Sequence, residues 1–517
     1  MTITDDRDAQ TRLVNQLLEM PARFPHAADR LDHIETHISH LLLAGEFVYK
    51  IKKPLDLGFL DFTTLEKRRR CCEEELRLNR RLAPSLYLAV VAIHGTPDRP
   101  TFEPEGPVLE YAVRMRRFRQ AELLSCRPPV RDEVRRLAAL VADFHLRIPS
   151  APADSVYGTP EVVLQPMMEN FRQIRELKQP LLEHERLDPL QTWTEEFAAS
   201  AAGLLDERRE AGHIRECHGD LHLGNITRFE GELTPFDGIE FNPALRWIDT
   251  LNDLAFLLMD LQHRGLGGVA DLLLNEYLER TGDYAALPLL RFYQLYRAMV
   301  RAKVSAIRLS QPGLPREEAM VVLDEYRRYL TLAESVIRHP PALLLLTHGV
   351  SGSGKSHIAG WLAEQLMAIR IRSDVERKRL FPQAEDGTRY TSRASDVCYA
   401  HLAGMAARLL QAGFVVVVDA TFLQRRQRQR FLELGERLQT PVLILDCEAP
   451  DAVLRERVAQ RAEAGGDASE ADLEVLSLQQ RQREPLSKAE QRQRIRIDSE
   501  HFPPPGLLAT VLQQLMG

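Results

Sequence analysis

A glycine-rich run in the last third of the chain decides the fold there: Gly349-Val350-Ser351-Gly352-Ser353-Gly354-Lys355-Ser356. It follows an apolar run, Ala342 to Thr347, and opens a segment of helical character, Ser356 to Met367. Glycines at this spacing let consecutive backbone N–H groups wrap a phosphate, while the next helix adds the positive end of its dipole. The pattern predicts a phosphate-binding loop in which Lys355 reaches the β and γ phosphates of ATP and Ser356 ligates Mg²⁺; an ordinary glycine turn is the alternative.

Further strands are expected after this loop, at Ile369 to Arg372, Phe414 to Val418 and Val442 to Leu445, with helical segments between them. Strands alternating with helices predict a parallel α/β sheet with helices on both faces. Asp419 directly follows the run of four valines, where a magnesium ligand lies in such folds. A carboxylate that only caps the strand is the alternative.

Asp374 also ends a predicted strand, in Ile371-Arg372-Ser373-Asp374. With these motifs, residues 342 to 500 resemble the small P-loop kinases related to polynucleotide kinase, gluconate kinase and zeta toxin. The resemblance implies that Asp374 is the general base, which accepts the proton of the attacking hydroxyl. It also implies that Leu454 to Arg461 is a lid, whose Arg457 and Arg461 close over the phosphates. These two arginines are four residues apart and share a helix face, although a solvated basic helix explains either one alone.

Two arginine-rich stretches, Arg425 to Arg430 and Arg481 to Arg496, could form a nucleic-acid groove. They contain no interleaved aromatic residues, and the formal net charge of −7 gives no global attraction to nucleic acid. We therefore favour solvated faces over a nucleic-acid site.

A second motif lies more than a hundred residues earlier: His218-Gly219-Asp220-Leu221-His222-Leu223-Gly224-Asn225, followed by Phe236-Asp237-Gly238. This is the spacing of a catalytic loop in which Asp220 orients and deprotonates a hydroxyl and Asn225 holds magnesium. Asp237 supplies the second metal-binding carboxylate. We expect His218 and His222 to pack and hydrogen-bond this loop rather than to bind metal.

Upstream, Lys50 in Phe47-Val48-Tyr49-Lys50 occupies the position of a phosphate-binding lysine on a kinase strand, and Glu75 in a charged helix could pair with it. Lys52 lies on the same strand face as Lys50, and Glu73 and Glu74 are alternatives to Glu75. Which lysine and which glutamate form the ion pair therefore stays open. No Gly-x-Gly-x-x-Gly precedes Lys50. The segment Thr36-His37-Ile38-Ser39 could cover the phosphates instead.

With these residues in view, positions 30 to 335 resemble the aminoglycoside phosphotransferase family, including its form fused to a P-loop kinase. The resemblance implies an N-terminal bilobal, protein-kinase-like fold. We expect a small lobe at 1–107, with a hairpin formed by Ile34 to Ala44 and Phe47 to Ile51, and a mostly helical lobe at 108–338. A P-loop kinase domain at 339–517 follows the break at Arg338-His339-Pro340-Pro341.

Antibiotic resistance does not follow from this resemblance. Aminoglycosides are polycations, and a site for them requires a dense acidic cleft. Asp249, Asp253 and Asp260 could contribute to one, but Asp249 and Asp253 are equally suited to anchoring the catalytic loop.

The composition fits a chain of two or three domains. The 517 residues are 44% hydrophobic and 27% charged, and no long uncharged apolar run could span a bilayer. The six cysteines form no Cys-x-x-Cys pair, which favours reduced thiols and a metal held by oxygen. We expect a cytoplasmic protein, because the N-terminus lacks the pattern of a secretory signal. The oligomeric state cannot be read from the sequence.

The sequence therefore predicts a tandem phosphotransferase that moves the γ-phosphoryl group of Mg-ATP to hydroxyl groups of small molecules at two sites. One alternative is a catalytic half gated by a nucleotide-binding switch half. Another makes the C-terminal half a 5'-hydroxyl kinase for RNA or DNA.

Overall fold

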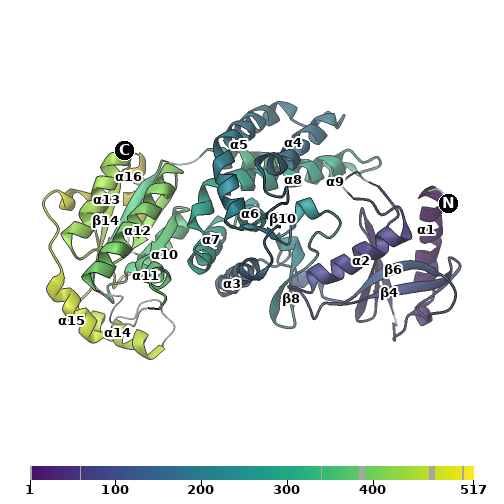
Figure 1. The fold of residues 1–517 in the computed structure, drawn as a ribbon, viewed down its shortest axis with the longest axis horizontal. Coiled ribbons are helices and arrows are strands. Elements are labelled where there is room, and N and C mark those ends of the chain that lie inside the picture. The colour runs from purple at the N-terminus through teal and green to yellow at the C-terminus, as the bar shows by residue number, and fades with distance from the viewer. Residues whose placement is uncertain are drawn as a thin grey trace. The chain divides into compact units, whose positions relative to one another are not determined.

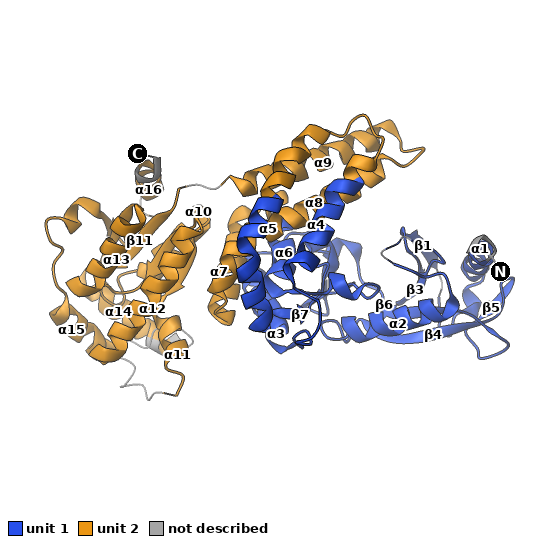
Figure 2. Cartoon of the chain, turned by 45° about the horizontal axis from the view of Figure 1, so that its top comes forward, with its two compact units in different colours: residues 1–173, 194–260 blue, residues 174–193, 261–517 orange. Residues whose placement is uncertain are grey.

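The structure is a computed structural model that describes residues 3–28, 30–56, 58, 60–338, 341–383, 391–464, 472–503 and 506–516 (Figure 1). The chain forms two compact units, residues 1–173 with 194–260 (unit 1) and residues 174–193 with 261–517 (unit 2), coloured separately in Figure 2. Each unit is described by itself. The predicted boundary at 338/339 stays a prediction, and two residues of its linker, 339 and 340, lie outside the described residues.

Unit 1 begins with helix α1 (Ile3–Glu19) and is built on a six-stranded sheet whose paired neighbours are all antiparallel. In spatial order the strands are β1 (Leu31–Glu35), β2 (Ser39–Ala44), β3 (Phe47–Lys52), β6 (Val108–Arg116), β4 (Tyr87–Thr96) and β5 (Arg99–Thr101). Helix α2 (Leu65–Asn79) begins after Thr64, whose side chain accepts a hydrogen bond from the Lys67 amide. The charged helix expected around Glu75 is thus confirmed.

The β2–β3 hairpin has a two-residue turn, because Ala44 pairs with Phe47 and Gly45 adopts a φ of 57°. The stretch Ile34 to Ala44, expected to form one side of this hairpin, is not a single strand in the structure. It is divided into β1 and β2 by a turn in which the Thr36 hydroxyl accepts from the Ser39 amide. The residues considered as a phosphate cover, 36–39, therefore form the tip of a hairpin and the start of β2.

The rest of unit 1 is mostly helical and carries two short ribbons. Its helices are α3 (Arg131–Arg147) and parts of α4 (Pro160–Glu176), α5 (Leu187–Glu210) and α6 (Thr250–His263). The ribbons pair β7 (Ile214–Glu216) with β10 (Trp247–Asp249), and β8 (Ile226–Phe229) with β9 (Glu232–Pro235). The His218 motif follows β7, and Asp237 follows β9.

Unit 2 contains helices α7 (Gly267–Thr281), α8 (Leu290–Leu309) and α9 (Arg316–Ile337) together with a five-stranded parallel sheet. In spatial order the strands are β12 (Ile369–Arg372), β13 (Val415–Asp419), β11 (Leu343–His348), β14 (Val442–Glu448) and β15 (Arg494–Asp498). Strand β15 was not expected from the sequence. The remaining helices are α10 (Lys355–Gln365), α11 (Ser373–Leu380), α12 (Ser392–Gln411), α13 (Arg425–Leu438), α14 (Asp451–Ala464), α15 (Leu473–Gln482) and α16 (Leu507–Met516).

Both faces of this sheet are covered. Leu343 and Leu345 share a buried core with side chains of α10 and α16. Successive side chains of a strand point to opposite faces, so the equally buried Leu344 and Leu346 lie on the other face. This parallel sheet with covered faces confirms the predicted fold. No helix of the described residues is long and apolar enough to cross a membrane.

Candidate active sites

The catalytic-loop motif of unit 1 brings Asp220 and Asn225 together. Asn225 Nδ2 donates to Asp220 Oδ2 at 2.8 Å and to the Asp220 carbonyl at 3.1 Å. Because the amide nitrogen is used in this way, the side-chain oxygen of Asn225 is the atom that can ligate a cation. The Phe236 amide donates to the Asn225 carbonyl at 2.9 Å, which brings the segment with Asp237 beside the loop.

Two histidines hold the loop, as expected. His222 Nδ1 accepts from the Gly224 amide, so its proton lies on Nε2, 3.4 Å from Asp220 Oδ2. His218 Nδ1 accepts from the Asp220 amide, and its Nε2 faces the Phe236 carbonyl at 3.0 Å. Burial lowers the pKa of His218, which favours this neutral form.

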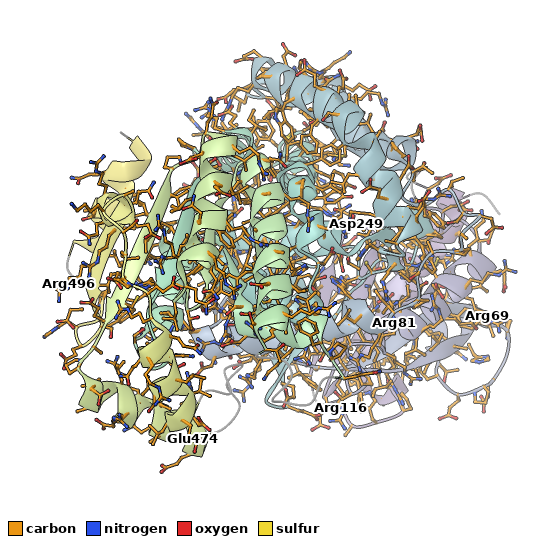
Figure 3. All side chains as sticks on the ribbon, turned by 60° about the vertical axis from the view of Figure 1, so that its left-hand side comes forward. Arg69, Arg81, Arg116, Asp249, Glu474 and Arg496 are labelled. Carbon is orange, nitrogen blue, oxygen red and sulfur yellow. The ribbon has the colours of Figure 1, made fainter. Side chains whose placement is uncertain are left out.

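The three candidate residues for an acidic cleft are buried and bonded within unit 1. Asp253 accepts from the amides of His218 at 3.1 Å and Gly219 at 2.8 Å, while Asp260 accepts from the Leu223 amide at 2.9 Å. Asp249, which is labelled in Figure 3, accepts from Arg208. Asp253 and Asp260 thus bond to the catalytic loop, which is the anchoring role considered for Asp253, whereas Asp249 bonds to Arg208 and to the Leu251 amide. Burial of all three carboxylates argues against a cleft for polycations built on them.

Lys50 and Lys52 both contact Glu75, which is fully buried. The Nζ–Oε distances are 2.9 Å from Lys50 and 2.7 Å from Lys52. The lysines differ in their second partner, because Lys50 contacts Asp237 at 2.5 Å whereas Lys52 contacts Glu240. The lysines hold the pKa of Glu75 at about 2 against the cost of burial, and the surrounding carboxylates raise the pKa of Lys50.

The competing glutamates of α2 have other partners. Glu73 accepts from Arg69 on the same helix, and Glu74 accepts from Arg77 and Arg246. Glu75 is thus the member of this run that lies between the two lysines. Of the lysines, Lys50 is the one beside the predicted metal ligand Asp237.

Unit 1 also contains a cavity of about 700 Å³ that extends from the β2–β3 turn along the end of β6. Its lining combines aromatic rings and cationic side chains: Phe47, Phe118, Phe229, Arg116, Arg119 and Arg228. Arg116 is labelled in Figure 3. Two of the arginines form ion pairs with carboxylates, Arg116 with Glu230 and Arg228 with Glu133, each with an N–O distance of 2.6 Å.

In unit 2 the glycine-rich run forms a loop between β11 and α10 that requires its glycines. Gly349, Gly352 and Gly354 have φ values of 141°, 80° and 81°, which side chains rarely adopt. A Cβ at Gly352 would approach the Leu454 carbonyl oxygen to 2.8 Å. Lys355 Nζ donates to the Val350 carbonyl at 2.7 Å, and burial lowers the pKa of this lysine.

Three predicted residues meet at the ends of β12 and β13. Ser356 Oγ donates to Asp419 Oδ1 at 3.2 Å. Burial and the neighbouring charge of Asp419 raise the pKa of Asp374, which lies in the first turn of α11. The arrangement combines a hydroxyl, two carboxylates and a lysine around the glycine loop.

The predicted lid arginine Arg457 contacts the loop directly. Its guanidinium donates to the Gly352 carbonyl at 3.3 Å and to the Ser499 hydroxyl at 2.9 Å. The positive charge of Arg461 contributes to lowering the pKa of Lys355, as expected for a cation beside the site. Gln479 of α15, which the sequence analysis missed, accepts from the Ser351 amide at 2.7 Å.

Several arginines from the two basic stretches are committed to partners inside unit 2. Arg428 is fully buried against Glu490 at 2.6 Å. Arg483 and Arg494 contact Asp446 at 3.0 and 2.5 Å, and this carboxylate also contacts His348. These pairs leave less cationic charge for a nucleic-acid groove than the sequence suggests.

The residues of unit 2 fit a nucleotide and a divalent metal. Ser353 Oγ and Asp419 Oδ2 are buried polar atoms without hydrogen-bond partners among the described residues, and both lie at the loop. A cavity of about 600 Å³ adjoins it, lined in part by Val350, Pro450 and Leu454. In unit 1 the donor set is equally suited to a metal, since Asn225 and Asp237 offer the oxygen ligands that Mg²⁺ prefers.

Two family models match the chain. Residues 60–290 match the phosphotransferase enzyme family, and residues 344–486 match an AAA domain. The uncharacterized protein Rv2004c of Mycobacterium tuberculosis is 32% identical over 463 residues, which cover 87% of this chain and 90% of that protein. The uncharacterized protein Mb2027c of Mycobacterium bovis matches to the same extent.

Two solved kinases resemble single parts of the chain. Amicoumacin kinase hAmiN is 14% identical, covering 64% of this chain and 95% of its own, with a TM-score of 0.38. A sugar kinase from Janibacter sp. HTCC2649 is 23% identical, covering 34% of this chain and 95% of its own, with a TM-score of 0.27. Both scores are too low to support an argument about substrate. The two family models and the mycobacterial relatives show that the chain is an ATP-dependent kinase of a family that joins an aminoglycoside phosphotransferase-like domain to a P-loop kinase domain.

Proposed function

We propose that the chain has two phosphotransfer sites, each of which moves the γ-phosphoryl group of Mg-ATP to a hydroxyl group of a small molecule. The observation that carries this proposal is that each unit pairs a carboxylate suited to a general base with separate oxygen ligands for a metal. In unit 1 these are Asp220 with Asn225 and Asp237. In unit 2 they are Asp374 with Ser356 and Asp419.

In the unit 1 site, Asp220 aims the acceptor hydroxyl and takes its proton as the oxygen attacks phosphorus. Asn225 and His222 hold the Asp220 carboxylate in position, so little reorganisation is needed during transfer. Lys50, held by Glu75, neutralises phosphate charge, and Asp237 with Asn225 binds the metal. A magnesium ion held by these two residues would stabilise the negative charge of the phosphates during transfer.

The cavity of unit 1 also supports the proposal that this unit binds a nucleotide. Its aromatic rings offer a flat apolar surface for a base. Its lining contains carboxylates as well as arginines, since Glu46, Glu122 and Glu230 lie beside Arg116, Arg117, Arg119 and Arg228. Arg116 is paired with Glu230 and Arg228 with Glu133, so the charge of this cavity does not select an acceptor of either sign.

In the unit 2 site, the backbone amides of the glycine loop and Lys355 bind the phosphates of the nucleotide. Asp374 takes the proton of the second acceptor hydroxyl, while Ser356 and Asp419 hold the metal. Arg457 and Arg461 on α14 balance the charge on the transferred group, and Arg457 already contacts the loop at the Gly352 carbonyl.

Metabolite profiling tests the proposal. A cell metabolite extract would be incubated with Mg-ATP and the wild type, Asp220→Ala or Lys355→Ala, and phosphorylated products would be identified by mass spectrometry. Asp154→Ala and Lys488→Ala replace exposed residues of the same types and serve as controls. We expect each site variant to remove its own set of products, or one step of a two-step product. If Lys355→Ala leaves every product in place, the unit 2 site is a nucleotide switch rather than a catalyst.

The alternative of a 5'-hydroxyl polynucleotide kinase is tested separately. Arg428, Arg483 and Arg494 are engaged by carboxylates, which argues against a groove built on them. Oligonucleotide binding that weakens steeply with salt would favour this alternative, because phosphate contacts release counterions. Absence of oligonucleotide binding at low salt would exclude the polynucleotide kinase.

A further inference from the structure

Helix α7 directs a stripe of polar side chains at the edge of the parallel sheet in unit 2. Asp271, Asn275 and Glu279 are spaced by four residues and therefore share one helix face. Asn275 accepts from the Arg370 amide at 2.7 Å and donates to the Ala368 carbonyl at 3.0 Å. Because β12 is an edge strand, these bonds satisfy backbone groups that no neighbouring strand pairs.

Glu279 extends this contact from the backbone of β12 to its side chains. One carboxylate oxygen accepts from Arg370 Nε at 3.0 Å, and the other contacts Arg372 Nη1 at 3.2 Å. The carbonyl of Glu279 accepts from Arg379 of α11 at 2.7 Å. Glu279 is thus bonded both to the strand that ends before Asp374 and to the helix that contains Asp374.

Arg372 lies between two carboxylates. Its Nη1 is within hydrogen-bonding distance of Glu279, whereas its Nε lies 3.8 Å from Asp419 Oδ2, beyond hydrogen-bonding distance. Asp419 Oδ2 is buried and has no hydrogen bond among the described residues. Arg372 is close enough to move onto this oxygen, and its bond to Glu279 opposes such a movement.

We propose that Glu279 is a positioning residue of the unit 2 site: by holding Arg372, it keeps an oxygen of Asp419 open for the divalent metal. The inference rests on the proposed role of Asp419 as a metal ligand. Without the Glu279 carboxylate, Arg372 loses an anionic partner, and Asp419 Oδ2, 3.8 Å from its Nε, is a carboxylate oxygen within its reach. A charge-assisted bond between them would occupy the oxygen that the metal needs.

The consequence is that a helix outside the region matched by the AAA-domain model controls metal affinity at the P-loop. Glu279→Gln should raise the metal concentration needed for half-saturation by about three- to tenfold, a change at the lower end of the coupling measured between neighbouring residues. In an Arg372→Gln background the same substitution should change this concentration by less than about twofold, because the competing cation is gone.

Metal binding is the direct readout. Mn²⁺ would be titrated into the full chain in the presence of the non-hydrolysable analogue AMP-PNP, with free Mn²⁺ measured by electron paramagnetic resonance. Asn225→Ala and Asp237→Ala in every sample remove the proposed metal ligands of unit 1. Glu433→Gln, on an exposed position of α13, controls for the loss of one negative charge from unit 2.

The outcomes separate the inference from the proposed function. Equal weakening by Glu279→Gln with and without Arg372 would mean a general charge effect and would overturn the inference. If Asp419→Ala leaves Mn²⁺ binding unchanged, the metal site itself is wrong and the inference falls with it. Should Glu279→Gln fail to fold, Glu279→Asp keeps the negative charge on a shorter side chain. It should weaken Mn²⁺ binding less than Glu279→Gln, and adding Arg372→Gln should cancel this weakening.

Discussion

Replacing Glu75 with glutamine removes the anion that two buried lysines share. The lysines hold the pKa of Glu75 at about 2, against its ordinary value of 4.5. A difference of that size corresponds to about 3 kcal/mol, since each pKa unit is worth about 1.4 kcal/mol. Removing one partner of a buried ion pair costs a similar amount, about 3–5 kcal/mol. We therefore expect Glu75→Gln to lower the free energy of unfolding of unit 1 by about 3 kcal/mol at neutral pH.

The pH dependence of this loss has a definite sign. Because the pKa of Glu75 is lowered on folding, its stabilisation is fully present above pH 4.5 and is lost as the pH falls toward 2. The difference in stability between wild type and Glu75→Gln should therefore shrink over that interval.

Trp247 is the single tryptophan of unit 1, because Trp193 and Trp361 belong to unit 2. Replacing those two by phenylalanine makes fluorescence during urea unfolding report on unit 1. Glu73→Gln is the matched control, since its pair with Arg69 is about half exposed and should contribute less than about 1 kcal/mol. If the two variants lose the same stability, the buried lysine–glutamate network is not what stabilises unit 1.

Three further predictions concern unit 2. Gly352→Ala should weaken nucleotide binding by this unit, since the residue has a φ of 80° and a Cβ would press on the Leu454 carbonyl. ATP would be titrated into Gly352→Ala in an Asp237→Ala background, and an affinity equal to that of Asp237→Ala alone would contradict the prediction. Burial and the charge of Asp419 raise the pKa of Asp374. As the pH decreases, the rate of product formation by unit 2 should therefore begin to fall at a pH above 3.8, the ordinary pKa of an aspartate. Asp374→Asn should abolish product at every pH in that rate profile, and residual activity with the same acid limb would assign the base elsewhere. Arg428→Met should destabilise unit 2 by about 3–5 kcal/mol in urea unfolding, because it leaves the buried carboxylate of Glu490 without its arginine. Oligonucleotide binding should not change. Reduced oligonucleotide binding with unchanged stability would instead place Arg428 in a nucleic-acid groove.

Local patterns carried much of what could be predicted. The glycine loop, the strand before it and the helix after it are set by neighbours in sequence, and β11 and α10 lie where they were expected. The catalytic loop is similar, because Asp220 and Asn225 are only five residues apart. In both motifs the spacing along the chain is short enough for the sequence to predict which side chains lie together.

Contacts between distant residues could not be predicted in the same way. Lys50 and Lys52 have the same strand face and the same partner in Glu75, so only the fold separates them, by placing Asp237 near one and Glu240 near the other. Strand β15 was missed because Arg494 and Arg496 alternate with its apolar residues and suggested a basic surface. In the fold those arginines pair with Asp446 and Glu448 of the neighbouring strand.

The two lysines proposed to bind phosphate have different surroundings, and this difference bears on how each site would use its metal. Lys50 lies between the carboxylates of Glu75 and Asp237, so a phosphate can recruit it only by competing with Asp237. A cation bound at Asp237 would relieve that competition, which couples nucleotide binding to metal binding in unit 1. Lys355 instead donates to the carbonyl of Val350, a neutral group that an anionic phosphate displaces readily. Under the proposed roles, nucleotide binding in unit 1 should therefore depend on a bound cation more strongly than nucleotide binding in unit 2 does.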